Sequence, residues 1–359
     1  NYFFRRDDNG NLTSGSGCGN DVASERPMVR KFIVDSVKYW ANEYNMDGFR
    51  FDLMGLMDIK TINEITAALK KIDPTILVIG EGWNMGTLPA NQRANQLNIQ
   101  KLNGVSHFND QIRDGIKGSV FDSTDTGFAT GKFGARNDVM SGIVGNVDYS
   151  TTINSKWTTA YPGQSVSYVE SHDNNTLADK IKASVKDAKP TDIAQLSQFS
   201  ASIAFLSQGV PFMQAGQEFL RSKNGDPNSY KSSDAINSIK WNTRKSNMSS
   251  VDYYKGLIAL RKSYSAFRMT TTEQVKSNLK FSDSPEGTIV YTLNGAAVKD
   301  KAATIVVIHN ANLEAQNISL PKGGTWSVLV EDEKAGTAVI RKITGTSISV
   351  KSRTTLVLT

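Results

Sequence analysis

The stretch DGFRFDLMG, from Asp47 to Gly55, decides how the rest of the chain is arranged. It predicts a short strand that opens at its carboxyl end onto a loop. Since side chains alternate along a strand, Phe49 and Phe51 face one side while Arg50 and Asp52 face the other. A cation and a carboxylate therefore lie side by side where the strand ends, which is where barrel enzymes carry their catalytic groups. A structural ion pair is the alternative, and this motif by itself leaves both readings open.

Helices and strands alternate around this stretch. Apolar residues recur at helical spacing between residues 25 and 44, and Pro27 suits the first turn of that helix. Asp58 is placed to cap a second helix over residues 59–71, and the apolar run ILVIGEGW at 76–83 predicts the next strand. The order helix, strand, helix, strand is typical of parallel βα units. Further strands are expected at 104–108, 165–175 and 209–219, and further helices at 109–118, 192–207 and 252–263, with long loops from 119 to 163.

The pattern changes after residue 268. Short apolar runs separated by Gly, Asn, Asp and Pro predict an antiparallel β-sandwich in this part. We therefore expect two domains, 1–268 and 269–359. The expected strands of the second domain are 288–293, 303–309, 325–330, 340–343, 347–350 and 354–358.

Composition excludes several classes of protein. The net charge of +6 comes from scattered Lys and Arg, without a basic stripe or interleaved aromatic residues, which argues against a nucleic-acid binder. No apolar run approaches the length of a membrane span. The lone Cys18 excludes an intrachain disulfide. The chain does not begin with Met, so we expect a part of a longer protein; an extracellular or cell-surface location is expected, with a cytoplasmic one as the alternative.

Three acidic residues follow buried-looking strands: Asp52, Glu81 and Asp173. Parallel strands end at one rim, so these carboxyl groups are expected to converge. Glycoside hydrolysis needs an ionised carboxylate that attacks the anomeric carbon and a protonated acid that serves the leaving oxygen. Arg50 keeps Asp52 ionised, whereas Trp83 and the nearby negative charges are expected to raise the pKa of Glu81 to about 6. No Ser-His-Asp elbow, phosphate loop or Cys/His cluster competes with this set.

Four motifs resemble characteristic regions of the α-amylase superfamily, glycoside hydrolase family 13: DGFRFD (47–52), GEGW (80–83), SHDNN (171–175) and GVPFMQAGQE (209–218). The continuous sequence around these motifs, including NSYKSSDAINSIKW at 228–241, is similar to the type I pullulanases in particular. The resemblance covers nearly the whole chain. It implies an α/β fold with a partial (β/α)8 TIM barrel, of which the last five βα units are present, followed by the β-sandwich domain.

The resemblance also implies roles, position by position. Asp52 would be the nucleophile with Arg50 as its partner, and Glu81 would be the general acid/base. Asp173, aided by His172, would hold sugar hydroxyls and distort the ring. The other implied substrate contacts are Trp83, which would stack on a glucose face, Asn174, Asn228 and Tyr230.

The activity implied is that of a retaining hydrolase of α-1,6 bonds in pullulan, glycogen and starch, acting by double displacement. Alternatives are an isoamylase-like or α-1,4-acting enzyme of the same superfamily, and an α-glucan-binding subunit without activity. The upstream motif that supplies another Asp and His is missing from the chain. We therefore expect that it works only with the missing N-terminal part of the same barrel as its partner.

Other polar and aromatic residues are expected to be structural or solvated, and no cofactor is expected. A calcium site is the alternative for three loop acids, but their spacing is not that of an EF-hand. Glu218 lies at the rim and is left out of the catalysis. The loop acids are Asp122, Asp125 and Asp138, and the residues assigned to packing are His107, His309, Tyr253, Tyr254 and Trp241.

Overall fold

A computed structural model describes residues 2–359 of the chain. The chain divides into two compact units, which are described one at a time. The first comprises the chain up to Phe108 together with Lys156–Val166, and the second comprises Asn109–Ser155 and Ser167–Thr359. Among the described residues, no helix has both the length and the apolar character that crossing a membrane requires.

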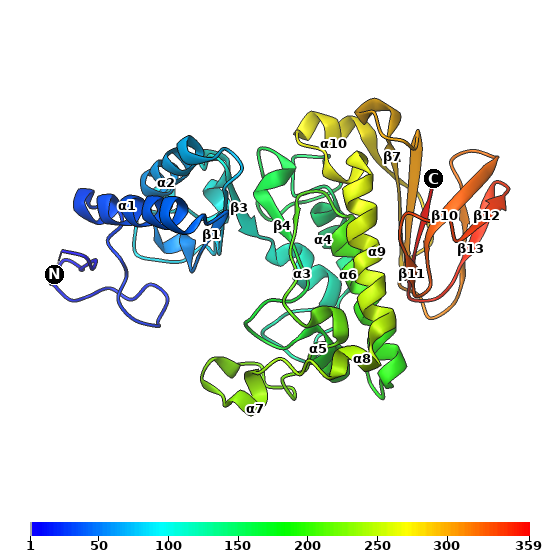
Figure 1. The fold of residues 1–359 in the computed structure, drawn as a ribbon, viewed down its shortest axis with the longest axis horizontal. Coiled ribbons are helices and arrows are strands. Elements are labelled where there is room, and N and C mark those ends of the chain that lie inside the picture. The colour runs from blue at the N-terminus through cyan, green and yellow to red at the C-terminus, as the bar shows by residue number, and fades with distance from the viewer. Residues whose placement is uncertain (1) are drawn as a thin grey trace. The chain divides into compact units, whose positions relative to one another are not determined.

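One or two α-helices separate successive strands as far as the fifth strand, except that only short 3-10 helices lie between β2 and β3 (Figure 1). The helices are α1 (Pro27–Tyr44), α2 (Ile59–Ile72), α3 (Asp110–Lys117), α4 (Arg136–Ile143), α5 (Leu177–Ser184), α6 (Pro190–Leu206), α7 (Asp234–Asn237), α8 (Thr243–Ser246), α9 (Met248–Ser263) and α10 (Thr272–Asn278). The strands are β1 (Gly48–Phe51), β2 (Leu77–Gly80), β3 (Val105–Phe108), β4 (Ser165–Ser167), β5 (Val210–Pro211), β6 (Leu279–Ser282), β7 (Thr288–Asn294), β8 (Thr304–Asn310), β9 (Gln316–Ser319), β10 (Thr325–Glu331), β11 (Lys334–Ala335), β12 (Arg341–Thr344), β13 (Ser347–Val350) and β14 (Thr354–Leu358).

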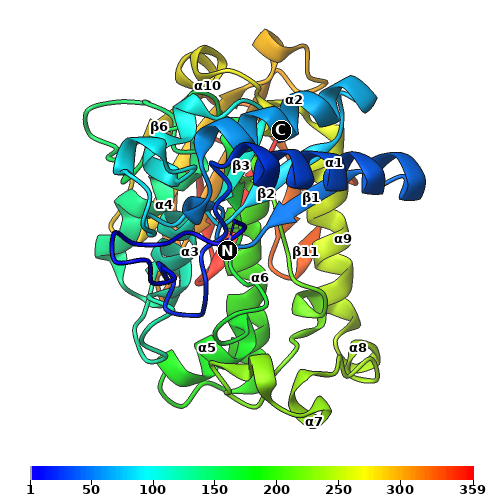
Figure 2. The same ribbon diagram turned by 90° about the vertical axis from the view of Figure 1, so that its left-hand side faces the viewer.

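The first unit contains β1, β2, β3 and the start of β4, which Figure 2 shows in succession from β1 to β3. The three pairs are parallel, with Arg50 opposite Ile79 in the first of them. Strand β4 crosses the boundary between the units, and in the second unit Phe212, just after β5, donates its N–H to the carbonyl of Ser167. The strand order β1-β2-β3-β4-β5 confirms the predicted run of five parallel βα units.

Helices α1 and α2 lie side by side and form the core of the first unit with the strands (Figure 1). α1 has Pro27 in its first turn and ends at Asn45, which has left-handed backbone angles that Asn tolerates. The carboxylate of Asp58 accepts from the N–H of Thr61, so the predicted cap of α2 is confirmed. The apolar side of α2 is buried against the strands because its apolar residues recur every three or four positions; the fully buried ones are Ile62, Ile65 and Leu69.

In the second unit, α6 is buried along most of its length and packs against α9 and α5 (Figure 1). The same core includes one face of the antiparallel sheet formed by β6, β7, β8, β14, β10, β11 and β12. A second core lies on the other face of this sheet, where β9 and β13 form a separate antiparallel pair. This confirms the predicted antiparallel β-sandwich, while the boundary between residues 268 and 269 stays a prediction.

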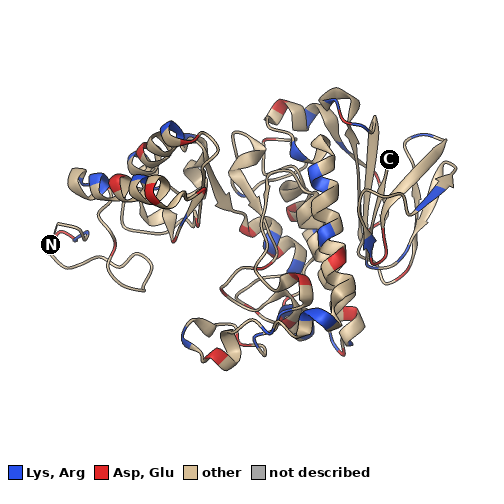
Figure 3. Cartoon of the chain, in the orientation of Figure 1, with Lys and Arg blue, Asp and Glu red and all other residues tan. Residues whose placement is uncertain are grey.

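Some elements differ from the sequence prediction. Strands β4 and β5 are much shorter than the strands predicted at 165–175 and 209–219. The residues after each strand form hydrogen bonds within their own segment, from the N–H of Leu177 to Glu170 and from the N–H of Gly216 to Glu218. The short elements α5, α7, α8, α10, β6, β9 and β11 were not predicted. Charges are interspersed on the helices, as Figure 3 shows for α1 and α9, in keeping with the absence of a basic stripe in the sequence.

Candidate active site

In the first unit, one guanidinium holds two carboxylates. Arg50 Nη1 donates to Asp52 Oδ1 at 2.7 Å, and Arg50 Nη2 lies 2.9 Å from Glu81 Oε1. Arg50 stands on β1, whose parallel pairing with β2 brings the two strand ends to the same edge. The structure therefore brings together three of the residues that the sequence placed at strand ends.

The two carboxylates have different surroundings. The Glu81 side chain is 11% exposed, whereas that of Asp52 is 70% exposed in this unit. The second oxygen of Glu81, Oε2, accepts from the backbone N–H of Leu53 at 2.9 Å. Leu53 has left-handed backbone angles, which cost energy in a residue other than glycine, so the loop holds this N–H toward Glu81 at the expense of local strain. Sequence reasoning missed this backbone donor, since no motif marks it.

Close backbone packing fixes the loops after β1 and β2. The N–H of Gly55 donates to the carbonyl of Glu81 at 3.1 Å. A Cβ at residue 55 would lie 2.0 Å from the carbonyl oxygen of Trp83, so only glycine fits there. Trp83 itself is half-buried beside Glu81 in the chain. The loop that ends in Gly55 therefore supports the backbone that carries Glu81 and Trp83.

His107 lies beneath the Gly80-Glu81-Gly82 segment. Its Nδ1 is 3.2 Å from the carbonyl oxygen of Gly80, and a Cβ at Gly82 would lie 2.5 Å from the imidazole ring. Complete burial lowers the pKa of His107 to about 4, so the ring is neutral at pH 7. Its Nε2 has no hydrogen-bond partner among residues 2–359. The predicted structural role of His107 is confirmed by its burial, and its place under Glu81 was not foreseen.

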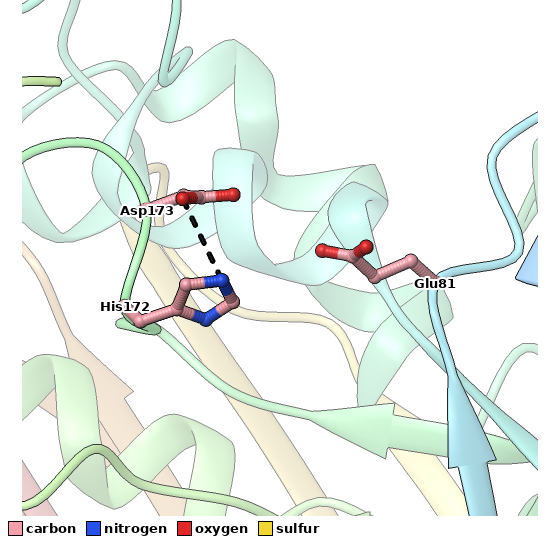
Figure 4. Close-up of side chains that lie close together, drawn as sticks. All are labelled: Glu81, His172 and Asp173. Carbon is pink, nitrogen blue, oxygen red and sulfur yellow. Dashed lines mark ion pairs between the residues drawn. The ribbon is translucent and has the colours of Figure 1, made fainter. Parts of the chain in front are cut away.

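In the second unit, His172 and Asp173 form an ion pair at the tip of the segment after β4, with Nε2 3.6 Å from Oδ1 (Figure 4). Both side chains are exposed. Asn174 follows with a positive φ of 62°, a conformation that Asn adopts more readily than most residues. Figure 4 also draws Glu81 just after β2. The segment 171–174 therefore presents its polar side chains to solvent within its own unit.

The outer candidate residues of the second unit lie on the segment after β5. Asn228 donates its N–H to Asp226 Oδ1 at 2.9 Å and precedes the short 3-10 helix Ser229–Lys231. Tyr230 is 75% exposed. Asn175 Nδ2 donates to the carbonyl of Gly225 at 3.0 Å, which links this segment to the one that carries His172 and Asp173.

The loop acids considered for calcium bind protein donors. Asp125 pairs with Lys132 at 2.9 Å and accepts from the N–H of Ser119. Asp122 accepts from Thr124, and Asp138 accepts from the side chain of Gln111. These contacts engage both carboxylate oxygens of Asp125 and one each of Asp122 and Asp138, so the geometry of these acids does not favour the calcium alternative. Tyr253, Tyr254 and His309 are buried, as predicted for packing residues, whereas Trp241 is 62% exposed and contacts the ring of Phe219.

Comparison with known proteins identifies relatives of this chain in sequence and in structure. The family model described as "Pullulanase, all-beta domain" matches residues 275–334. Pullulanase from Bacillus subtilis (strain 168) is 40% identical over 331 residues, which are 92% of this chain and 46% of that protein. The crystal structure of apo pullulanase from Paenibacillus barengoltzii has a TM-score of 0.94 at 41% identity, covering 99% of this chain and 54% of that one.

A ligand-bound relative is equally similar. The type I pullulanase structure from Bacillus subtilis complexed with maltose has a TM-score of 0.94 at 38% identity and covers 99% of this chain. The aligned residues make up 50% of the chain of that relative. The present chain thus spans about half the length of the relatives named here.

Proposed function

This chain belongs to the pullulanase family, and on that premise we propose that the protein is a retaining glycoside hydrolase that cleaves α-1,6 bonds in pullulan and branched α-glucans. The observation that carries the proposal is the Arg50 guanidinium, which contacts the carboxylates of Asp52 and Glu81 through two nitrogen atoms. A retaining mechanism needs its two carboxyl groups about 5 to 5.5 Å apart, whereas an inverting one needs room for a water between them. Two carboxylates on one planar guanidinium favour the closer arrangement.

Asp52 is the nucleophile in this proposal. The Arg50 guanidinium contacts its carboxylate, which is exposed and free to approach the anomeric carbon. Attack forms a bond from Asp52 to the anomeric carbon and breaks the bond to the leaving oxygen. Water then attacks the glycosyl ester, which releases the sugar with its original configuration and regenerates Asp52.

Glu81 is the acid and then the base. It gives its proton to the leaving oxygen in the first step and takes a proton from water in the second. The ion pair with Arg50 stabilises the ionised form of Glu81 in the ligand-free state. Donation therefore requires that the bound substrate, together with the nearby Trp83, shields Glu81 from water and weakens this pair.

The remaining residues hold the glucan. His172 and Asp173 bind hydroxyls of the sugar under attack, and Trp83 stacks on a glucose face. Asn174, Asn228 and Tyr230 contact neighbouring glucose units, for which the exposed ring of Tyr230 offers an apolar surface. The maltose-bound relative supports an α-glucan as the ligand class.

A partner within the same barrel completes the first unit. Strand β1 pairs with β2 on one edge, and within residues 2–359 its other edge has no strand neighbour. Beside it lies an apolar cavity of about 860 Å³ whose lining includes Phe32, Phe51 and Leu53. An open strand edge and an exposed apolar face are unfavourable in water. We propose that the earlier βα units of the barrel cover this face, so the 359 residues alone should be inactive while a longer form that includes those units is active.

The decisive experiment measures hydrolysis of pullulan and amylose by the natural full-length protein. New reducing ends should form from pullulan, and Glu81→Gln should lower kcat by at least about 1,000-fold because the proton donor is lost. Glu218→Gln is the matched control, since the carboxylate of Glu218 accepts a hydrogen bond from the backbone N–H of Gly216 in its own turn and takes no part in the proposed site. Cleavage of amylose but not pullulan would refute the α-1,6 assignment, and an active Glu81→Gln variant would remove Glu81 from the mechanism.

A further inference from the structure

The segment Glu170–Leu177 in the second unit forms a closed loop that carries His172, Asp173 and Asn174 at its tip. Its two ends are joined by one hydrogen bond, from the N–H of Leu177 to Glu170 Oε2 at 2.8 Å. Leu177 is the first residue of α5, so Glu170 also satisfies a backbone donor at the start of that helix. The geometry of the exposed tip therefore depends on a buried carboxylate at the base of the loop.

A lysine holds the same loop from the other side. Lys223 Nζ donates to the carbonyl oxygen of His172 at 2.5 Å. The N–H of Lys223 donates to Asp179 Oδ2 at 2.7 Å, and Ser222 Oγ donates to Asp179 Oδ1 at 2.6 Å. Because Asp179 is on α5, the helix that follows the loop also anchors the lysine that holds it.

The cost of burying Glu170 indicates that its position matters. Its side chain is completely buried, and within the described part of the chain Oε1 has no hydrogen-bond partner. Burial raises the pKa of Glu170 to about 7, although the hydrogen bond from Leu177 and the positive charges of Lys117, Arg221 and Lys223 act to lower it. A buried carboxylate with one unsatisfied oxygen is less favourable than an apolar side chain of similar size, so its contribution lies in the contact that it makes.

We propose that Glu170 and Lys223 are positioning residues that fix the His172–Asp173 loop in the conformation that binds the sugar. The inference rests on the proposed function for what the loop binds, but the fixing of the loop rests on its own contacts. Glu170 fixes the base of the loop and Lys223 fixes the backbone directly beneath His172. Both residues are buried, so in this proposal they act on the sugar only through the loop.

Hydrogen exchange of the natural full-length protein tests the fixing of the loop without any activity measurement. Glu170→Met keeps much of the volume of the side chain and removes the acceptor of the Leu177 N–H, and Lys223→Met removes the donor to His172. Both variants should exchange the amides of residues 171–175 at least about tenfold faster than wild type, while Lys223→Arg, which keeps a cationic donor, should restore slower exchange. Asp252→Asn and Lys255→Met are the matched controls, because they change an exposed ion pair of the same unit.

Kinetics on pullulan then separates positioning from general stability. We expect kcat to fall about tenfold or more in Glu170→Met with KM changed less than threefold, because a displaced loop loses contacts that matter most in the transition state. Exchange like that of wild type in both variants, or faster exchange with unchanged kcat, would overturn the proposal. If wild type itself does not hydrolyse pullulan while the variants still loosen the loop, the proposed function fails and the fixing of the loop stands.

Discussion

Arg50 on β1 reaches Glu81 beyond the end of β2, with Nη2 2.9 Å from Oε1. This contact joins residues 31 positions apart, 81 minus 50 in the chain numbering. Glu81 is held a second time by the N–H of Leu53, two residues past the end of β1. The loop after the first strand thus orients the carboxylate of the second, which is the arrangement that a preorganised pair of catalytic carboxyl groups requires.

Replacing Arg50 by Lys should disable this arrangement while retaining the positive charge. Guanidinium presents two nitrogen atoms in one plane, whereas ammonium is a point charge that cannot bind both carboxylates in the same way. In the natural full-length protein we expect kcat/KM on pullulan to fall about 100-fold, equivalent to about 3 kcal/mol of transition-state stabilisation. The melting temperature should change little, since Asp52 is exposed in this unit and the ammonium of Lys can still pair with the mostly buried carboxylate of Glu81.

Arg341→Lys is the control for that substitution. Arg341 also binds a carboxylate through two nitrogen atoms, at Glu331 in the β-sandwich, and it takes no part in the proposed site. Its replacement should leave kcat/KM unchanged. Wild-type activity in Arg50→Lys would show that the shared guanidinium is not needed.

Gly82→Ala should destabilise the protein because the space for a side chain is filled by His107. The added Cβ would lie 2.5 Å from the imidazole, and forcing a methyl group into a packed site costs about 1 to 3 kcal/mol. Urea unfolding of this chain measures the change in the free energy of unfolding. Gly134→Ala is the matched control, since a Cβ there meets nothing within 4 Å.

The double variant Gly82→Ala with His107→Ala tests whether this contact is the cause. Removing the imidazole makes room for the new methyl group, so the two changes together should cost less than the sum of their separate costs. Strictly additive costs would locate the damage elsewhere.

His309 should make stability depend on pH. Burial lowers its pKa from 6.5 to about 3, so in acid the unfolded chain binds a proton that the folded chain does not. The free energy of unfolding is therefore highest above pH 6.5 and falls as pH decreases toward 3. From about pH 6.5 to about pH 4.5 the loss from this group is about 2 kcal/mol.

Urea unfolding of this chain at these two pH values, followed by circular dichroism, measures that slope. His309→Phe suits the surrounding rings of Phe199 and Tyr291 and cannot titrate, so its unfolding free energy should fall less over the same range. His172→Gln changes an exposed histidine and should keep the wild-type slope. An equal slope in His309→Phe would show that His309 does not govern this dependence.

The sequence by itself determined the local elements and the identity of the candidate residues. The helices α1, α2, α3 and α6 and the cap at Asp58 follow from apolar spacing and capping, which depend on residues a few positions apart. The strand ends that carry Asp52 and Glu81 follow from the same local patterns. For these features, neighbouring residues in the chain contain the needed information.

Only the tertiary structure decided which distant residues meet. Three contacts could not be read from any local pattern: Arg50 with Glu81, His107 beneath Gly82, and Lys223 with His172. Each depends on how strands pair and how loops return, and the short-range patterns that predict an element carry no information about its partners. The early ends of β4 and β5 have the same cause, since a strand lasts only as long as a neighbouring strand pairs with it.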